Sequence, residues 1–328
     1  MKHDIRQAAK TLVSQLKAID YERLPISKYN KCYIARLKPV LSYYMKIYAD
    51  CLLKGLESVG SAPKDITFID YGGGSGFLSK LSKQAGIGRV IYIDLNPDSV
   101  DTIRVLKALA GTGPDIILHG DSDTLADWCS ANKVKPQLLI ATDLIEHVYD
   151  LSAFFDNLAA INKMQMLFTT ASTPFNPYVK RKLHRLMTTW EKEYYALRLH
   201  YIHLHFPALS PAEAKEAARK TRGLTFPHIR KAVENGSYPL LKDAFNTCDP
   251  RNGNWTERIL PIETYRSLAK PFGYQVQIGK GFYNTDRPNP ISALISSGIN
   301  GLIRISGKAG FLFAPFITLY LRNDNKGQ

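Results

Sequence analysis

The sequence ITFIDYGGGSGFLS occupies residues 66–79 and places four glycines directly behind an apolar run. A dinucleotide-binding loop has the spacing Gly-x-Gly-x-x-Gly, in which the third glycine lets the following helix pack against the first strand. No reading frame through this loop supplies that third glycine, which argues against NAD and FAD. The spacing is instead acid-x-Gly-x-Gly-x-Gly, formed by Asp70, Gly72, Gly74 and Gly76. Such glycines let the backbone turn sharply and come close to a ligand.

Around this loop, short apolar runs alternate with helix-length segments. That alternation is typical of βα units and of a parallel, doubly wound sheet. The runs are ITFID, RVIYIDL, DIILHGD, QLLIATDL and MQMLFTT. Two later runs, YQVQI at 274–278 and PFITLYL at 315–321, complete a mostly parallel, seven-stranded sheet. The predicted fold class is therefore α/β, of the doubly wound, Rossmann-like kind.

The pattern divides the chain into four regions. Residues 1–60 form a helical N-terminal extension, and residues 61–173 form the core around the glycine loop. Residues 174–260 form a helical insertion before the sixth strand, much longer than an ordinary connection between elements. Residues 261–328 end the sheet and carry a hydrophobic insertion at 291–313.

Composition limits the class of protein. A chain of 328 residues with 45% hydrophobic residues folds around a core, which excludes disorder. Four cysteines without a Cys-x-x-Cys pair indicate a reducing compartment. The first residues lack the layout of a signal peptide, and no apolar run is long enough to span a bilayer, so we expect a cytoplasmic protein. The net charge of +14 favours an anionic partner such as RNA, a phospholipid surface or a phosphorylated substrate.

Two acids downstream strengthen the interpretation of the glycine loop. Asp94 ends the second strand about 20 residues after Gly72, the interval at which an acid meets ribose hydroxyls. Asp121 follows the third strand. Together with the loop, these residues resemble the class I S-adenosylmethionine-dependent methyltransferases, in which the acid or amide after the third strand faces the adenine amino group. A helix cap is the alternative role for either acid. The resemblance implies S-adenosylmethionine as cofactor, bound by Asp70, Gly72, Gly74, Gly76, Asp94, Asp121 and Thr142.

The fourth strand runs into TDLIEH, residues 142–147. DNA adenine and some protein amide methyltransferases of this fold carry Asn or Asp, then Pro-Pro and an aromatic residue here, so N-methylation of that type is disfavoured. Asp143, Glu146 and His147 stand at i, i+3 and i+4, and one helical turn would place them on one face. Two carboxylates and an imidazole form a ligand set suited to a divalent ion such as Mg²⁺.

This acid-x-x-Glu-His motif resembles the metal site of ubiquinone-biosynthesis O-methyltransferases and of small-RNA 3′-terminal 2′-O-methyltransferases, although those families have Glu where Asp143 stands. Both methylate one oxygen of a vicinal pair, which a divalent ion can chelate and acidify. Three hypotheses follow for the catalytic role of Asp143, Glu146 and His147. They bind a metal, or His147 acts without metal as general base, or Asp143 caps a helix and His147 merely packs.

The insertion at 174–260 is the expected source of any further ligand. Its histidines are His200, His203, His205 and His228. Its segment DPRNGNWTERIL offers Arg251, Trp255, Glu257 and Arg258. A Trp beside polar side chains is typical of a sugar-binding surface, and the alternative is a structured loop anchored by one Trp. The basic patches KRKLHR and ARKTR could contact RNA phosphates or be solvated helix faces.

The hydrophobic insertion has helical spacing. In ISALISSGINGLIRI an apolar stripe faces away from Ser296, Asn300 and Arg304. One hypothesis is an interfacial helix that lies on the inner face of a membrane, and the alternative is a helix packed on the sheet.

The sequence thus predicts an S-adenosylmethionine-dependent O-methyltransferase, acting on a hydroxyl of a sugar, glycan or phenolic substrate, free or carried on a lipid. Its overall likeness is to surface-glycan methyltransferases. An RNA ribose 2′-O-methyltransferase is the alternative enzyme, and a catalytically inactive, methyltransferase-like binding protein is the alternative outside the enzymes.

Overall fold

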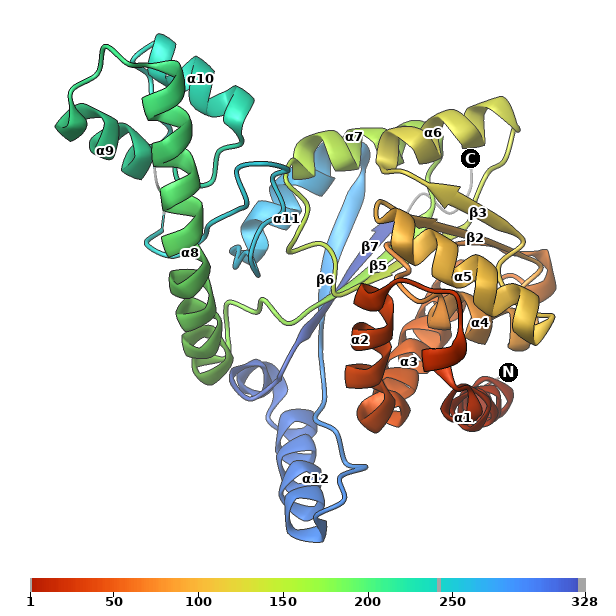
Figure 1. Ribbon diagram of the computed structural model, residues 1–328. Helices are drawn as coiled ribbons and strands as arrows, with labels where there is room; N and C mark the ends of the chain where they lie inside the picture. Colours follow the sequence, from red (N-terminus) through yellow and green to blue (C-terminus); the bar gives the residue numbers. More distant parts are fainter. Residues whose placement is uncertain (1, 241–242, 324–328) are drawn as a thin grey trace.

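The computed structural model describes residues 2–240 and 243–323. A seven-stranded sheet runs through its centre, with helices against both faces (Figure 1). The strands are β1 (Thr67–Tyr71), β2 (Arg89–Asp94), β3 (Ile116–His119), β4 (Leu138–Thr142), β5 (Gln165–Thr170), β6 (Tyr274–Lys280) and β7 (Ile317–Asn323). Their order is β3-β2-β1-β4-β5-β7-β6, and among the described strands β7 alone runs in the opposite direction to the other six. The predicted mostly parallel, doubly wound sheet is confirmed.

Helices separate the strands and cover the sheet. Those of the N-terminal region are α1 (Lys2–Ala18), α2 (Lys28–Leu37) and α3 (Leu41–Val59). Those between the parallel strands are α4 (Phe77–Gln84), α5 (Pro97–Ala110), α6 (Ser122–Ala131) and α7 (Leu151–Ile161), and α11 (Ile262–Ala269) precedes β6. Short 3₁₀ turns lie at η1 (Tyr21–Arg23), η2 (Lys38–Val40), η3 (Pro63–Asp65) and η4 (Lys270–Phe272).

Alternate residues of the central strands build two cores. Phe68 and Ile140 belong to the core under α1, α3 and α4, whereas Ile69 and Leu139 belong to the core under α6, α7 and α11. Strands that are buried on both faces read as continuous apolar runs, which is why β1 and β4 stood out in the sequence. Their carboxyl ends are thereby held in fixed places at one edge of the sheet.

The insertion forms a separate group of helices that stands out from the sheet (Figure 1). It consists of α8 (Pro177–His205), α9 (Pro211–Lys220) and α10 (Phe226–Glu234). A small core of its own, around Ile202, Ala218 and Ile229, holds these helices together. After α10 the chain returns to the carboxyl edge of the sheet, where residues 246–258 lie beside the end of β4.

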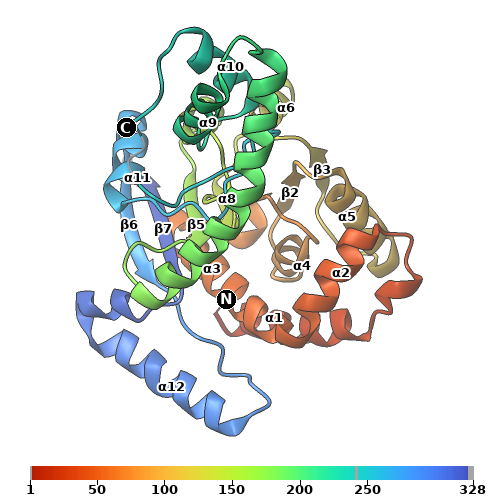
Figure 2. The same cartoon turned by 60° about the vertical axis from the view of Figure 1, so that its left-hand side comes forward.

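A second projection, α12 (Pro290–Ile305) with η5 (Gly307–Leu312), lies between β6 and β7 in the sequence and extends beyond the body of the molecule (Figure 2). Leu294 is 75% exposed and Ile305 76% exposed, so the apolar stripe does not pack on the sheet. The alternative of a helix whose apolar stripe packs on the sheet is therefore wrong. The buried residues of α12 are Ser296 and Ile303. None of the described helices combines the length and the apolar composition that crossing a bilayer requires.

Candidate active site

The chain turns out of β1 through three glycines with positive φ: Gly72 at 66°, Gly74 at 52° and Gly76 at 70°. A Cβ atom on Gly72 would lie 1.9 Å from Leu144 Cδ1, and one on Gly76 would lie 2.1 Å from Ile103 Cδ1. A Cβ atom on Gly74 would meet nothing within 4 Å. At the outer two positions a side chain would have to displace Leu144 or Ile103 and adopt a left-handed backbone, while Gly74 faces open space that a ligand can enter.

Asp70 lies beneath this loop and is only 2% exposed. Its Oδ2 accepts hydrogen bonds from the backbone N–H of Ser79 at 2.9 Å and from the Ser79 hydroxyl at 2.7 Å. Burial raises the pKa of Asp70 to about 7, although the bonds from Ser79 oppose the shift. The carboxyl thus joins the end of β1 to the first turns of α4. Contact between Asp70 and a ligand amino group stays a prediction.

Asp94 joins the glycine loop to the end of β2. Its Oδ2 accepts from the N–H of Gly74 and its Oδ1 from the N–H of Asn96, both at 2.8 Å. Burial raises the pKa of Asp94, and these two bonds oppose the shift. The cap of α5 is Asn96, whose side chain accepts from the N–H of Asp98. The alternative of a cap for Asp94 is therefore wrong.

Asp121 does cap a helix. It accepts from the N–H groups of Asp123 and Thr124 at the start of α6, as the alternative proposed. The same residue lines a cavity of about 640 Å³ at the carboxyl ends of β1, β2 and β3. Gly72, Asp94 and His147 line this cavity as well. It lies where the strand order reverses between β1 and β4, the usual ligand position in open α/β sheets.

The segment after β4 is a turn and not a helix. Thr142 ends the strand opposite Thr169 of β5. Asp143 has a φ of 56°, which a helix cannot continue, and the N–H of His147 donates to the carbonyl of Leu144 at 2.8 Å. The predicted helical turn is therefore wrong, and with it the prediction that it places Asp143, Glu146 and His147 on one face. Asp143 is exposed, whereas Glu146 is fully buried.

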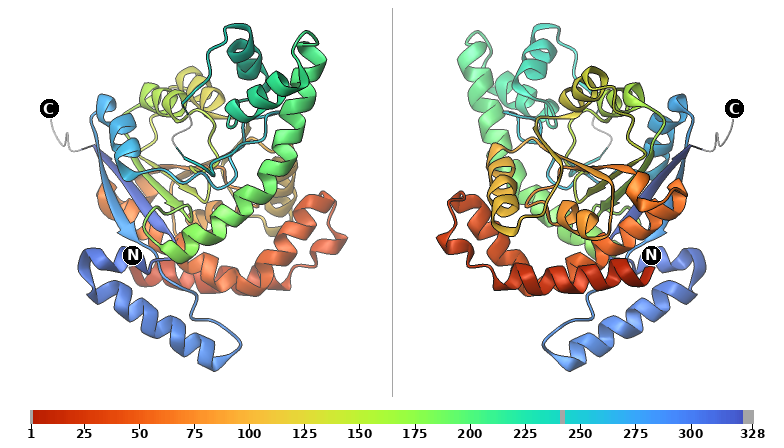
Figure 3. Two further views of the ribbon diagram at one scale, coloured as in Figure 1. Left: turned by 90° about the vertical axis from the view of Figure 1, so that its left-hand side faces the viewer. Right: turned by 90° about the vertical axis from the view of Figure 1, so that its right-hand side faces the viewer.

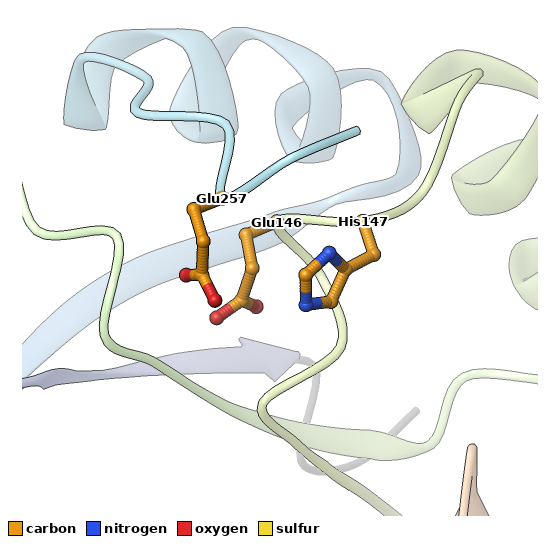
Figure 4. A group of neighbouring side chains, drawn as sticks. All are labelled: Glu146, His147 and Glu257. Atoms are coloured by element: carbon orange, nitrogen blue, oxygen red, sulfur yellow. The ribbon is translucent and has the colours of Figure 1, made fainter. Parts of the chain in front are cut away.

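Glu146 and His147 are joined by Glu257, which comes from the end of the insertion (Figure 4). One ligand atom from each of the three lies within 4.8 Å of the other two. Within the described residues, neither carboxylate oxygen of Glu146 has a well-formed hydrogen bond. Burial raises the pKa of Glu146 well above its ordinary value, and the charges of Asp143 and Glu257 add to the shift, while its own backbone N–H and the Thr170 hydroxyl oppose it weakly. An unpaired buried carboxylate beside a second one fits a site for a divalent cation.

Glu257 is the site residue that sequence reasoning placed elsewhere. It has a φ of 53°, and its Oε2 accepts from the Ser172 hydroxyl at 3.0 Å. The pKa of Glu257 is raised overall. Burial and the charge of Asp143 raise it, and His147, Ser172 and Lys182 oppose the shift. The only signal in the sequence was an acid inside the segment DPRNGNWTERIL, whose partners lie far away in the chain.

Trp255 anchors that segment and does not offer a sugar platform. It is 8% exposed, and its indole N–H donates to the carbonyl of Tyr149 at 3.2 Å. The guanidinium of Arg258 lies 4.0 Å from the centre of its ring. Arg251 is paired with Asp249 beside it. The alternative of a loop anchored by one Trp therefore holds.

The histidines proposed as further ligands lie outside the cluster. His200, His203 and His205 lie on α8, and His228 bonds to the Tyr149 hydroxyl at 2.9 Å and to the Thr225 hydroxyl at 2.8 Å. Within the described residues, the ligand that the insertion contributes is thus a carboxylate.

Tyrosines of the N-terminal helices border the same acids, and sequence reasoning missed them. Tyr33 is 38% exposed, and partial desolvation of its hydroxyl, with Tyr44 and Asp143 nearby, raises its pKa. Burial also raises the pKa of Tyr44, with contributions from Asp143 and Glu257. Two tyrosines of the N-terminal region therefore lie near the acids of the candidate site.

Residues 43–224 match the model of a protein family described as "Methyltransferase domain". The match covers more than half of the chain, which therefore belongs to this family. The predicted class, a methyltransferase of the S-adenosylmethionine-dependent kind, is confirmed at that level. A search of curated proteins gave no significant match.

Three solved structures show weak similarity. A putative sarcosine dimethylglycine methyltransferase from Galdieria sulphuraria is 11% identical, covers 86% of this chain and 88% of its own, and has a TM-score of 0.43. The methyltransferase domain of bacterial CtHen1-CN is 13% identical, with 83% and 95% covered and a TM-score of 0.39. A SAM-dependent methyltransferase from Aquifex aeolicus is 18% identical, with 36% of this chain covered and a TM-score of 0.29. The match spans 62% of the Aquifex protein, less than two thirds of its length.

Proposed function

We propose that the protein is an S-adenosylmethionine-dependent O-methyltransferase whose Glu146, His147 and Glu257 hold a divalent cation beside the acceptor hydroxyl. The observation that carries the proposal is the fully buried carboxylate of Glu146, whose oxygens have no well-formed hydrogen bond within the described residues and which lies next to a second carboxylate. A fully buried carboxylate and a half-buried one this close together do not both stay ionised without a compensating positive charge. A bound divalent cation supplies that charge and lowers the pKa of a coordinated hydroxyl.

The residues of this chain orient the cluster. The N–H groups of Trp255 and Arg258 donate to the carbonyls of His147 and Glu146, at 3.3 Å and 3.2 Å, so the insertion runs alongside the motif. This pairing brings Glu257 against Glu146. In the transfer, the bond from the sulfonium to the methyl would break and leave its electron pair on sulfur as the thioether, the bond from the methyl to the acceptor oxygen would form, and the hydroxyl proton would pass to water.

The cavity beside the cluster is the proposed cofactor site. Asp94 lines it and is held by the N–H groups of Gly74 and Asn96, which leaves the rest of its carboxylate available to ribose hydroxyls. Gly74 leaves space for a ligand against the backbone. Asp121 is the proposed partner of the adenine amino group.

The acceptor we propose is a sugar, glycan or phenolic hydroxyl on a molecule that also carries an anionic group, including one borne by a lipid. The first turns of α8 carry Lys180, Arg181, Lys182 and Arg185. Lys182 lies close enough to lower the pKa of Glu257. The rings of Tyr33 and Tyr44 supply flat apolar surface of the kind that packs against sugar and phenol rings. The same cations also favour a second candidate, the terminal ribose of an RNA.

The test offers labelled S-adenosylmethionine to the enzyme with glycan, quinone-precursor and RNA fractions in turn. We expect label in the glycan or phenolic fraction, loss of turnover in chelator, and recovery with Mg²⁺ or Mn²⁺. Label in RNA alone would select the second candidate. Binding of S-adenosylhomocysteine without turnover in any fraction would select an inactive binding protein.

Cation binding is measured separately by calorimetry with Mn²⁺. We expect Glu257→Gln and Glu146→Gln each to weaken Mn²⁺ binding by about 10-fold or more. The control is Glu193→Gln, a half-exposed acid on α8 that contacts only the loop residue Arg251 among the described ion pairs. A different set of results would contradict the cation and indicate His147 as general base. In that case the wild type would keep full turnover in chelator, Glu257→Gln would keep it too, and a His147 variant would lose it.

A further inference from the structure

The orientation of α12 is fixed by its polar side. The Asn300 amide accepts from the N–H of Tyr283 at 2.7 Å and donates to the carbonyl of Tyr283 at 2.9 Å. At the end of the helix, Lys280 Nζ donates to the carbonyls of Ile303 and Gly307 at 2.5 Å and 3.0 Å. These bonds hold the helix to β6 and the segment after it, with Ser296 facing inward. The apolar side is thereby turned outward.

The outward side is a continuous apolar surface, which we call the α12 face. It comprises Ile291, Leu294, Ile295, Leu302 and Ile305, exposed by 68%, 75%, 57%, 40% and 76%, together with Leu312 and Phe313, exposed by 50% and 41%. Single exposed apolar side chains are common on proteins, whereas a contiguous group marks a surface that binds something.

Beyond Asp286, which pairs with Lys46, the charge along this projection has one sign. The sequence from residue 287 to residue 322 contains no Asp or Glu. Its cations nearest the face are Arg287, Arg304 and Lys308, all exposed. Pairing of two copies through this face would place the cations of one copy, Arg287, Arg304 and Lys308, beside those of the other, which opposes self-association. An anionic surface has the complementary charge.

The α12 face also lies at the outer end of the molecule. Figure 3 shows α12 beyond the sheet, at the end where α1 lies. Next to the segment before α12, a cavity of about 580 Å³ opens between α1 and α3, with Phe282 in its lining. Its charged lining residues are the cations Arg6, Lys10 and Lys46 and the acids Asp50 and Asp286, of which Lys46 and Asp286 form a pair. Arg6 and Lys10 of α1 can therefore approach one flat surface together with α12.

We propose that the α12 face inserts into the surface of an anionic phospholipid membrane, with the helix axis parallel to the membrane plane. Apolar side chains enter the boundary between headgroups and acyl chains, and the flanking cations pair with lipid phosphates. A helix of 16 residues suits this in-plane position.

The proposed membrane contact is connected to the candidate active site by one short segment. Phe311 of η5 packs against Phe175, with ring centres 5.2 Å apart, and Asn176 donates to the carbonyl of Ala314 at 3.0 Å. Ser172, at the start of the same segment, donates to Glu257. Membrane binding by the α12 face does not require the proposed methyl transfer, so an experiment can contradict either proposal and leave the other standing.

Flotation of the full chain with vesicles tests the proposal. We expect recovery with phosphatidylcholine vesicles that contain phosphatidylglycerol, and little recovery with phosphatidylcholine alone. Leu294→Ser with Ile295→Ser should lower the bound fraction about 10-fold or more, as should Arg304→Gln with Lys308→Gln. The matched control, Leu109→Ser with Leu204→Ser, removes two similarly exposed apolar side chains on α5 and α8 and should float like the wild type.

Several results would overturn it. They are no flotation of the wild type with anionic vesicles, equal flotation with neutral and anionic vesicles, or equal flotation of Leu294→Ser with Ile295→Ser and the wild type. Light scattering without vesicles provides the remaining check. A dimer that becomes a monomer in the same double variant would assign the face to self-association instead.

Discussion

The Nδ1 atom of His147 lies 2.7 Å from the carbonyl oxygen of Trp255. A carbonyl only accepts hydrogen bonds, so Nδ1 carries the proton and Nε2 keeps its lone pair. Trp255 thereby selects the form of the imidazole that can bind a cation or take a proton.

This geometry predicts the outcome of His147→Asn. The Asn amide can still donate to Trp255, but nothing replaces Nε2, so turnover should fall by about 100-fold or more while the melting temperature changes little. The control is His203→Asn, which changes an exposed histidine on α8. A long-range ¹H–¹⁵N spectrum of the wild type should show the Nδ1–H form. A proton on Nε2 in the ligand-free protein would contradict this prediction.

Gly74→Ala tests whether the glycine loop binds the cofactor, and Gly60→Ala is its matched control. Both glycines have positive φ, 52° and 74°, and a Cβ atom on either would meet nothing within 4 Å. Each substitution should therefore cost about 1–2 kcal/mol of stability through backbone strain alone. Of the two, only Gly74 bonds to a residue that lines the proposed cofactor site, Asp94, so only Gly74→Ala should weaken binding of S-adenosylhomocysteine, by about 10-fold or more. Calorimetry and thermal unfolding measure both effects, and equal affinities in the two variants would remove the loop from the binding site.

Asp70 should make stability depend on pH. Its carboxyl has a pKa of about 7 in the fold, against 3.8 for an unperturbed Asp. The folded state therefore binds the proton more tightly than the unfolded state, and this contribution is complete below about pH 4 and lost as the pH rises to about 7. Relative to Asp70→Asn, which can keep both bonds to Ser79, the wild type should lose up to about 4 kcal/mol of unfolding free energy across that range. Urea denaturation at several pH values measures the difference, and parallel curves for the two proteins would rule out the shifted carboxyl.

The sheet and the proposed cofactor end of the site could be predicted from the sequence because their signals are local. The run before Gly72 and the apolar strand ending in Asp94 each specify an element within a few residues. The turn after β4 could not be predicted, since the spacing of Asp143, Glu146 and His147 fits a helix as well as a tight turn. The left-handed backbone at Asp143 decides between them.

Two further features depend on contacts between distant segments. Glu257 reaches Glu146 only because residues near Trp255 bond to the backbone after β4, and no local pattern encodes that pairing. The amphipathic pattern of α12 was visible, but it does not say which side faces out. The bonds between Asn300 and Tyr283 determine that the polar side faces in.

The last prediction concerns the support of Glu257 by the insertion. Arg198 is fully buried and donates to Glu191 at 2.6 Å and to the carbonyl of Ala218 at 3.0 Å. Glu191 also accepts from the Thr247 hydroxyl at 2.6 Å, which ties α8 to the segment that leads to Glu257.

Arg198→Met leaves Glu191 without its cation, so it should lower stability by about 3–5 kcal/mol. Mn²⁺ affinity should fall with it, because the segment after Thr247 loses its hold on α8. Adding Glu191→Gln should recover much of the stability, since the amide can still accept from Thr247 and no unpaired charge remains. Arg219→Met is the control, because its pair with Glu216 is exposed and should matter by less than about 1 kcal/mol. Urea denaturation and Mn²⁺ calorimetry measure these effects on the wild type, the two Arg198→Met proteins and Arg219→Met. Unchanged Mn²⁺ affinity in a destabilised Arg198→Met would show that the bonds between α8 and Thr247 do not support the cation site.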